Sequence, residues 1–432
     1  MVQHVYVVGL DELNRAELAS VRNADDYAFH GLVPYDMIVN PASYRMPEIM
    51  RTARRELEDG PPADAIIGHW DFPTTSMLPI LRREHGLRSP SLESVLLCEN
   101  KYWARRAMRD AVSESTPPFQ HVDPFAADPW KDMELEPPFW LKPTVAFSSY
   151  LGFHIDSEAR FREAIDRIRE GIGRFARPFE YIMDHVEDRS ALPPVGSGGT
   201  CVAESIISGD LCTLEGFVQN GEVVVYGVLD SARGPNQVSF FSYQLPSRLP
   251  EAVRERMIRN AEKLVRRLGL DDTPFNIEMF WNREDDRIWI LEINPRISKS
   301  HCPLFRMTAG SSHHEVAIDV ALGRRPDFPR QDGSFRVAAK FMPRTYQDAT
   351  VTRVPTEEDI ARVKERFPEL VFHPHVSEGT RLSDLPNQDS YSFEIADLFL
   401  GGEDEKELRT KLHEVMEGLD FRFSERVSTN YE

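Results

Sequence analysis

The sequence predicts an α/β fold that opens with a small domain around a parallel β-sheet. Residues 2–9 and 64–68 are short β-prone runs separated by helical or loop segments, and a helix is predicted at 75–85 before Gly86. Strands that alternate with helices favour parallel pairing, because each crossover needs a long connection that is usually helical. Farther along the chain, apolar residues at helical spacing and a predicted hairpin indicate further helices and strands.

Hydrophobic periodicity and turn residues predict the later elements. Asn100 is a good N-cap for a helix that carries Lys101 in its first turn. Apolar residues recur at helical spacing in 156–172 and in 253–268, and Gly269 closes the second helix. The remaining predicted elements are a proline-rich linker or irregular loop at 116–138, a strand at 139–143, a flexible loop at 192–200, a strand and a hairpin turning at Asn220-Gly221 within 201–229, a helix at 313–322, a strand at 336–342 and a last helix over 408–419.

Composition narrows the class of protein. A chain of 432 residues holds two to four domains, and its formal charge of −19 disfavours a nucleic-acid partner, which requires a basic face. No apolar run is long enough to cross a bilayer, and the N-terminus lacks a charged-then-apolar signal segment. The four cysteines have no CxxC spacing, which is typical of reduced thiols. We therefore expect a cytoplasmic protein without a membrane partner.

The most informative segment is a predicted β-hairpin. Residues 275–281 and 287–296 are apolar and β-prone, and the polar residues between them predict a turn. A turn centred near residue 285 places Glu278 opposite Glu292, with Cβ atoms roughly 4.5–5.5 Å apart. Two carboxylates this close repel each other unless a proton or a cation lies between them.

Further groups share the face of this acidic pair. Period-two alternation puts Asn294 on the face of Glu292. The same register places Trp281 opposite Trp289 on the other face of the hairpin. Two carboxylates and an amide oxygen form an all-oxygen site suited to Mg²⁺ or Mn²⁺. Arg296 continues the face, where it could hold an anion beside the metal.

A solvated hairpin with unrelated acidic residues is the alternative to a metal site. Ile288 and Ile290, together with the Trp, Leu and Ile of the opposite face, predict a buried strand, in which unused carboxylates are costly. The apolar flanks therefore favour the metal site.

Two lysines and a glutamate are candidate nucleotide contacts. Lys142 ends a predicted strand before the loop 144–152, whose backbone N–H groups could wrap phosphates while the lysine offsets their charge. Glu204 precedes backbone groups that could meet an adenine edge. Each candidate has an ordinary alternative, which is a surface loop for 144–152, a solvated lysine for Lys101 and a simple strand end for Glu204.

The order of these motifs resembles the ATP-grasp superfamily over nearly the whole chain. The motifs that carry the resemblance are Asn100-Lys101, Trp140-Leu-Lys-Pro143, Glu204-Ser-Ile-Ile-Ser-Gly209, Glu215, Glu278 and Leu291-Glu-Ile-Asn-Pro-Arg-Ile-Ser298. The specific part is the Glu-x-Asn-x-Arg element with a second glutamate fourteen residues upstream. The order of Lys101, Lys142 and Glu204 along the chain supports their assignment as nucleotide contacts.

The resemblance implies that the protein uses ATP with Mg²⁺ or Mn²⁺. It implies that phosphates contact Lys101, Lys142 and the loop residues Ser148 and Ser149, and that adenine contacts Glu204 and the backbone of Ile206 and Ile207. It also implies that Mg²⁺ is bound by Glu278, Glu292 and Asn294. Arg296 would then stabilise the transferred phosphate or the acyl phosphate. Glu215 matches the next acidic position of the motif. Leu211 departs from the family, because an acidic ribose contact is common there, and the phosphate loop is poor in glycine.

The resemblance also implies the domain organisation. It predicts an N-terminal Rossmann-like parallel-sheet domain, then a two-lobed ATP-grasp fold with a C-terminal lobe. The corresponding boundaries are 1–98 for the N-terminal domain, 99–200 for the first lobe with the phosphate loop, 201–325 for the second lobe with the metal site, and 326–432 for the C-terminal lobe.

Within the superfamily, the layout is most similar to L-amino acid ligases and biotin carboxylases. Residues 227–231 and 244–250 resemble the ligases, whereas Ser300 replaces a glutamate that carboxylases carry there. The implied activity is carboxylate–amine ligation through an acyl phosphate, with release of ADP and phosphate, on amino acids or related small molecules. A degenerate ATP-binding regulator and an ATP-dependent carboxylase are the alternatives. Family members are commonly dimers, so the resemblance also allows a homodimer.

Two further expectations concern the surroundings of the site. The loops 144–152 and 190–200 are candidates for a lid, because an acyl phosphate must be kept from water. Residues 298–301 follow the metal strand and are candidates for the acceptor pocket, with a surface loop as the alternative of equal weight.

Overall fold

The computed structural model describes residues 2–39, 41–147, 150–236, 238–385, 391–425, 427 and 429. The chain divides into two compact units, which are described separately. The first contains Met1–Tyr226, Pro250–Lys299 and His314–Phe328, and the second contains Gly227–Leu249, Ser300–His313 and Pro329–Glu432. Among the described helices, none has the length and apolar character needed to cross a membrane.

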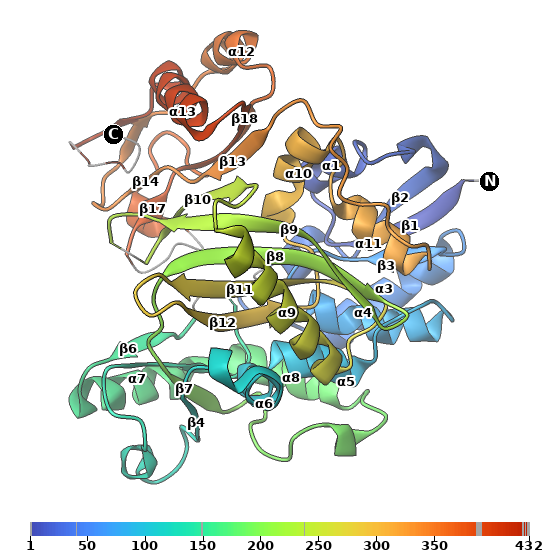
Figure 1. Cartoon of the computed structure of the whole chain (residues 1–432), viewed down its shortest axis with the longest axis vertical. Helices are drawn as coiled ribbons and strands as arrows, with labels where there is room; N and C mark the ends of the chain where they lie inside the picture. Colours follow the sequence, from blue (N-terminus) through green and yellow to red (C-terminus); the bar gives the residue numbers. More distant parts are fainter. Residues whose placement is uncertain are drawn as a thin grey trace. The chain divides into compact units, whose positions relative to one another are not determined.

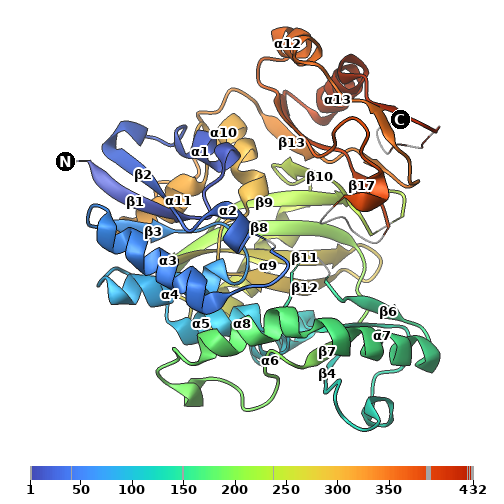
Figure 2. The same ribbon diagram turned by 180° about the vertical axis from the view of Figure 1, so that it is seen from behind.

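The first unit opens with a three-stranded parallel sheet in the order β2-β1-β3. Its elements are β1 (Gln3–Val8), α1 (Glu12–Leu18), β2 (Tyr27–Leu32), α2 (Tyr35–Ile38), α3 (Met46–Asp59), β3 (Ala65–Ile67), α4 (Thr74–Glu84) and the later helix α11 (His314–Ala321). Side chains alternate along β1, so that Val5 and Val7 pack in one core with α1 and α11, and Tyr6 and Val8 pack in another with α3 and α4. Helices therefore cover both faces of the sheet (Figures 1 and 2), as parallel sheets require.

The next part of the first unit is a four-stranded antiparallel sheet in the order β4-β7-β5-β6. Its elements are α5 (Leu92–Glu99), α6 (Lys101–Val112), β4 (Phe119–Val122), β5 (Phe139–Pro143), β6 (Phe153–Ile155), α7 (Glu158–Gly171), α8 (Gly173–Met183) and β7 (Cys201–Ser205). The side chain of Asn100 caps α6 by accepting from two backbone N–H groups, as predicted. The prediction of irregular structure over 116–138 was wrong at its start, because β4 pairs there with β7.

The strands that carry the acidic hairpin follow. They are β8 (Asp210–Gln219), β9 (Glu222–Arg233), of which residues 222–226 belong to this unit, β11 (Thr273–Asn282) and β12 (Arg287–Asn294), with helix α9 (Glu251–Leu268). Asn220 and Gly221 both have positive φ, 50° and 72°, as the tight turn between β8 and β9 requires. Helix α9 ends at Gly269 with φ of 66°, and its predicted apolar stripe is buried.

The second unit is built on an antiparallel sheet that starts with β9 from Gly227 and continues in the order β10-β13-β18-β16. Its elements are β10 (Phe240–Leu245), α10 (Cys302–Ala309), β13 (Val337–Phe341), β14 (Arg344–Thr345), β15 (Val351–Arg353), α12 (Glu357–Arg366), β16 (Val371–Pro374), β17 (Phe393–Glu394), β18 (Ala396–Gly402), α13 (Glu405–Leu419) and β19 (Arg422–Phe423). Leu408 and Leu412 of α13 pack with Leu398 and Leu400 of β18 in one hydrophobic core. The last predicted helix is thereby confirmed.

Candidate nucleotide and metal site

The acidic hairpin has the predicted register at the end that carries Glu278 and Glu292. Glu278 of β11 lies directly opposite Glu292 of β12, and both side chains are half-buried. Ile288 and Ile290 are buried, as expected for a strand that packs on the core. The structure therefore confirms the facing of the two carboxylates on which the metal hypothesis depends.

The pairing of the two tryptophans was predicted wrongly. Trp281 lies opposite Ile288, and Trp289 lies opposite Phe280. The register shifts between residues 278 and 279, because Leu291 is one extra residue on β12. A β-bulge therefore separates the turn from the acidic pair.

The face of the acidic pair extends over three strands. Across β8, β11 and β12, one row contains Thr213, Glu278 and Glu292. The neighbouring row contains Glu215, Asn276 and Asn294. Opposed residues of antiparallel strands project to the same side, so six polar side chains share this face.

Hydrogen bonds within this face engage the amide nitrogen of Asn294 and turn its oxygen toward the role of a cation ligand. The amide nitrogen of Asn294 donates to Oδ1 of Asn276 at 3.0 Å and to Oε1 of Glu292 at 3.5 Å. These bonds engage the nitrogen of Asn294, whereas Mg²⁺ would take its oxygen. Glu278, Glu292 and Asn294 thus fit a hard divalent cation.

Glu215, which the resemblance placed among the nucleotide contacts, lies on this same face. It is fully buried, and its Oε1 accepts from the backbone N–H of Ser298 at 3.3 Å. Burial raises the pKa of Glu215 well above its usual range, Glu278 adds to the rise, and Arg296 opposes it. The structure therefore links Glu215 to the face of the acidic pair, where a divalent cation would favour its charged form.

Arg296 is held by a carboxylate from the N-terminal sheet. Nε of Arg296 donates to Oδ1 of Asp71 at 2.7 Å, and Nη2 donates to the same oxygen. Burial lowers the pKa of Arg296, but Asp71, Glu215 and Glu99 together outweigh burial and raise it overall. Asp71 lies in the loop between β3 and α4, and this contact holds the guanidinium within electrostatic range of Glu215.

Glu204 on β7 forms a buried ion-pair cluster. Nε of Arg105, from α6, donates to Oε2 of Glu204 at 2.9 Å, and Nζ of Lys142, from β5, pairs with Oε1. Burial alone would raise the pKa of Glu204, but the two cations lower it to about 2. Burial also lowers the pKa of Lys142, and Arg105 and Lys101 add to this effect while Glu204 opposes it. Two cations thus pair with this carboxylate, and the charge of Lys101 acts on Lys142, so the positive charges outnumber the negative charge and favour binding of an anion.

Lys101 lies next to the predicted phosphate loop. Its Nζ donates to the carbonyl of Ala146 at 2.5 Å, and its backbone N–H donates to the carbonyl of Thr144 at 2.8 Å. Ser148 and Ser149, which were predicted to contact phosphate, lie outside the described residues. Lys101 and Lys142 are therefore the groups of this region that the structure brings together.

The predicted adenine contacts lie just after Glu204. Ile206 and Ile207 follow β7 outside any strand, and 41% of the surface of Ile206 is exposed. Gly209 has φ of 137°, and a Cβ there would lie 2.3 Å from the carbonyl oxygen of Trp281. Only glycine allows this close approach of the β7–β8 connection to the hairpin. Leu211 is buried and cannot act as an acidic ribose contact.

Sequence reasoning missed three residues of this site, namely Asp71, Arg105 and Asn276. Asp71 and Arg105 lie far from their partners along the chain, so no local pattern marks them. Asn276 did carry a signal, because it stands two residues before Glu278 and hence shares its strand face.

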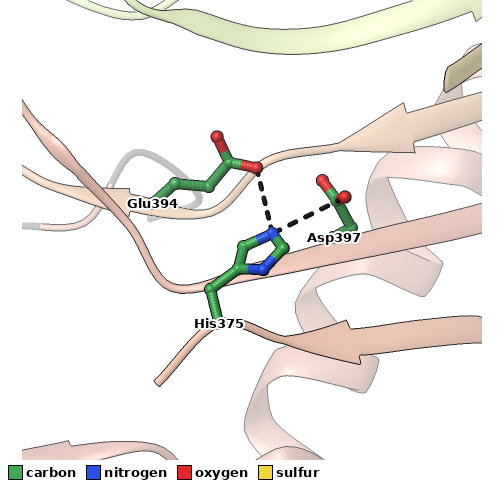
Figure 3. Close-up of side chains that lie close together, drawn as sticks. All are labelled: His375, Glu394 and Asp397. Carbon is green, nitrogen blue, oxygen red and sulfur yellow. Dashed lines mark ion pairs between the residues drawn. The ribbon is translucent and has the colours of Figure 1, made fainter. Parts of the chain in front are cut away.

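A separate cluster in the second unit contains His375, Glu394 and Asp397 (Figure 3). Nε2 of His375 lies 3.4 Å from Oε1 of Glu394 and 3.5 Å from Oδ2 of Asp397. Nζ of Lys340 lies 2.7 Å from Oδ1 of Asp397, and Arg344 pairs with Glu394. Both carboxylates already have cationic partners, so we assign an ion-pair cluster and not a metal centre.

His375 should make the stability of the second unit depend on pH. Burial lowers the pKa of His375, but hydrogen bonds and charges from Asp397 and Glu394 raise it from 6.5 to about 9. Its stabilising effect is therefore fully present below pH 6.5 and is lost as the pH rises through about 9. Since about a third of the side chain is exposed, we expect a contribution below about 1 kcal/mol.

Urea unfolding of the wild type and of His375→Gln between pH 6 and pH 10 measures this contribution. The two unfolding free energies should converge as the pH rises. The exposed His85, replaced by glutamine, serves as the control and should show no such convergence. A constant difference across the range would contradict the assignment.

Comparison with known proteins agrees with this geometry. Residues 135–303 match the family model of the ATP-grasp domain. The chain contains an ATP-grasp domain. The match includes Lys142, Glu204 and the whole acidic hairpin, and the predicted family and fold class are confirmed. No curated protein matches the chain at a significant level.

Solved structures share the fold over the whole length of the chain. An L-amino acid ligase from Bacillus licheniformis has a TM-score of 0.75 at 15% identity, covering 98% of this chain and 99% of that chain. An N5-carboxyaminoimidazole synthase from Aspergillus clavatus has a TM-score of 0.65 at 15% identity, with coverages of 97% and 99%. A biotin carboxylase from Campylobacter jejuni has a TM-score of 0.63 at 15% identity, with coverages of 99% and 93%. At this identity the likeness establishes the fold alone.

Proposed function

We propose that the protein is an ATP-dependent carboxylate–amine ligase that forms an acyl phosphate and releases ADP and phosphate. The observation that carries this proposal is the facing of Glu278 and Glu292, with Asn294 on the same face and Arg296 two residues farther on. The ATP-grasp domain and the fold of an L-amino acid ligase support it. Amino acids or related small molecules are the proposed substrates.

Different residues of the site bind different parts of ATP. Lys101 and Lys142 bind its phosphates, and the backbone after Glu204 binds adenine. Glu278, Glu292 and Asn294 would hold Mg²⁺, which neutralises negative charge on the phosphate oxygens when it is bound. Arg296 is planar and permanently charged, which suits the oxygens of the carboxylate and of the acyl phosphate.

The reaction proceeds in two steps. In the first, an oxygen of the acid substrate attacks the γ-phosphorus of ATP, the bond to the β-phosphate oxygen breaks, and ADP leaves. In the second, the nitrogen of the amine attacks the acyl carbon, the carbon–oxygen bond to phosphate breaks, and the nitrogen loses a proton. Arg296 orients the acyl group in both steps, because Asp71 fixes its guanidinium.

Release of ADP tests the proposal. The protein is incubated with Mg²⁺, ATP and pools of amino acids, and ADP, AMP and phosphate are measured. We expect ADP without AMP, and only in mixtures that contain both a carboxylate and an amine. Tight binding of Mg·ATP with no turnover in any pool would contradict the ligase proposal and favour a regulatory ATP-binding protein. Bicarbonate-dependent formation of ADP would instead favour a carboxylase.

A further inference from the structure

The carboxyl ends of the three parallel strands carry an aromatic pair. Trp70 follows β3, and its Nε1 donates to the carbonyl of Gly9, which follows β1, at 2.9 Å. Tyr35 follows β2, and its ring meets the Trp70 ring edge-on, with centroids 5.4 Å apart. Ligands of open parallel sheets bind at this edge. The aromatic pair of Tyr35 and Trp70 is therefore placed where a ligand would bind.

Backbone strain marks the same edge. Val33 has φ of 60°, which is a rare conformation for a β-branched residue. Its N–H donates to Oε2 of Glu56 at 2.8 Å, which holds this conformation. Val33 leads through Pro34 into Tyr35, a residue that is 45% exposed. Strain of this kind concentrates at functional sites, and here it presents a large aromatic side chain to solvent.

Charged groups from the end of the metal strand lie against the aromatic pair. Nζ of Lys299 lies 4.6 Å from the centroid of the Trp70 ring, within cation–π range. Asp71, the residue after Trp70, is paired with Arg296 at 2.7 Å. An anion and a cation therefore lie side by side, next to an aromatic surface.

We propose that this edge of the N-terminal sheet binds the α-amino acid whose carboxylate is activated, an inference that rests on the proposed ligase function. The ammonium and carboxylate of an α-amino acid are attached to one carbon, so their recognition requires neighbouring groups of opposite charge. Asp71 receives the ammonium, and Arg296 receives the carboxylate. Tyr35 and Trp70 contact the side chain, which makes large apolar or aromatic amino acids the substrate class.

The hydrogen bonds of Arg296 permit this role. Its Nε and Nη2 donate to Asp71, and its Nη1 donates to the carbonyl of Ile297 at 3.1 Å. Of the five guanidinium N–H groups, these bonds use three with partners among the described residues. The other two, one on each terminal nitrogen, suit a ligand carboxylate in a forked arrangement.

Tyr35→Ala is the first test, because Tyr35 is exposed and its loss should leave the fold intact. Calorimetry measures the affinity of L-phenylalanine in the presence of Mg²⁺ and a non-hydrolysable ATP analogue. We expect Tyr35→Ala to weaken binding about five- to tenfold, since an aromatic contact contributes about this factor. Tyr391→Ala, at a tyrosine that is 50% exposed in the second unit, is the matched control and should bind like the wild type.

Removal of the ammonium from the ligand is the second test. The wild type should bind 3-phenylpropionate at least about tenfold more weakly than L-phenylalanine, because Asp71 then lacks a cationic partner from the ligand. Asp71→Asn should lose most of this preference. Hydroxylamine as the amine substrate traps the acyl phosphate as a hydroxamate, which gives a rate for the activation step. The KM of the acid and the KM of ATP can then be measured separately in Asp71→Asn. The KM of the acid should change, and the KM of ATP should not.

The outcomes distinguish failure of the amino-acid subsite from failure of the ligase function. Equal affinity of wild type and Tyr35→Ala for L-phenylalanine, or no binding of the amino acid to the wild type, would overturn the subsite whatever the turnover shows. Amino-acid binding that depends on Tyr35 would support it. If ADP and hydroxamate are then absent, the ligase function fails while the subsite stands.

Discussion

Glutamine in place of Glu292 is expected to lower the rate of ADP formation at least about a hundredfold. Residues that only orient metal ligands already contribute about 10- to 100-fold, so the loss of a ligand charge should cost at least the upper figure. Glu278 faces Glu292 directly, and glutamine has the same shape as glutamate. Glu278→Gln should have the same effect.

The stability of these variants distinguishes a metal ligand from a structural residue. Without metal, glutamine removes the repulsion between two facing carboxylates, so the unfolding temperature of Glu292→Gln should equal or exceed that of the wild type. Stabilisation by added Mg²⁺ and nucleotide should be lost in the same variant. Thermal unfolding with and without Mg·ADP measures both effects.

Glu284→Gln is the matched control, because Glu284 is exposed in the turn of the same hairpin. It should behave like the wild type in activity and in stabilisation by Mg²⁺. Undiminished ADP formation by Glu292→Gln would contradict both the metal site and the ligase proposal.

The local part of this site could be predicted from the sequence. Strand residues alternate with period two, and the turn residues fix which residues face each other, so Glu278, Glu292 and Asn294 could be placed on one face. The same rule failed for Trp281, because a β-bulge at Leu291 shifts the register between the turn and the acidic pair. Counting from a turn cannot reveal an extra residue on one strand.

Contacts between distant segments could not be predicted from one chain. Asp71 and Arg296 are 225 positions apart, and Arg105 and Glu204 are 99 apart. Pairings at such separations depend on how whole elements pack, which hydrophobic periodicity does not encode. The ion pairs of His375 escaped notice for the same reason, since Glu394 and Asp397 lie on the next two strands along the chain, β17 and β18.

Arg105→Met is expected to lower the free energy of unfolding by about 3–5 kcal/mol, the usual cost of removing one partner from a buried ion pair. Besides Glu204, Arg105 binds the carbonyls of Ile290 and Leu291, at 2.9 and 2.8 Å. Leu291 is the bulge residue next to Glu292. One buried guanidinium thus connects Glu204 on β7 to β12, the strand that carries Glu292. Arg105→Lys keeps the charge but cannot span three acceptors, so its loss should be intermediate.

Two measurements show whether Arg105 acts through its charge and through the bulge. Glu204 has a pKa lowered to about 2, so its ion pairs stabilise the fold above its ordinary value of 4.5 and lose this effect as the pH falls toward 2. The difference in unfolding free energy between wild type and Arg105→Met should therefore shrink below pH 4.5.

The Mg²⁺ concentration for half-maximal ADP formation should rise about 10- to 100-fold in Arg105→Lys, because the bulge no longer fixes Glu292. Arg109→Met, at an exposed arginine of the same helix, should change neither. Unchanged Mg²⁺ dependence in Arg105→Lys would limit Arg105 to a role in stability.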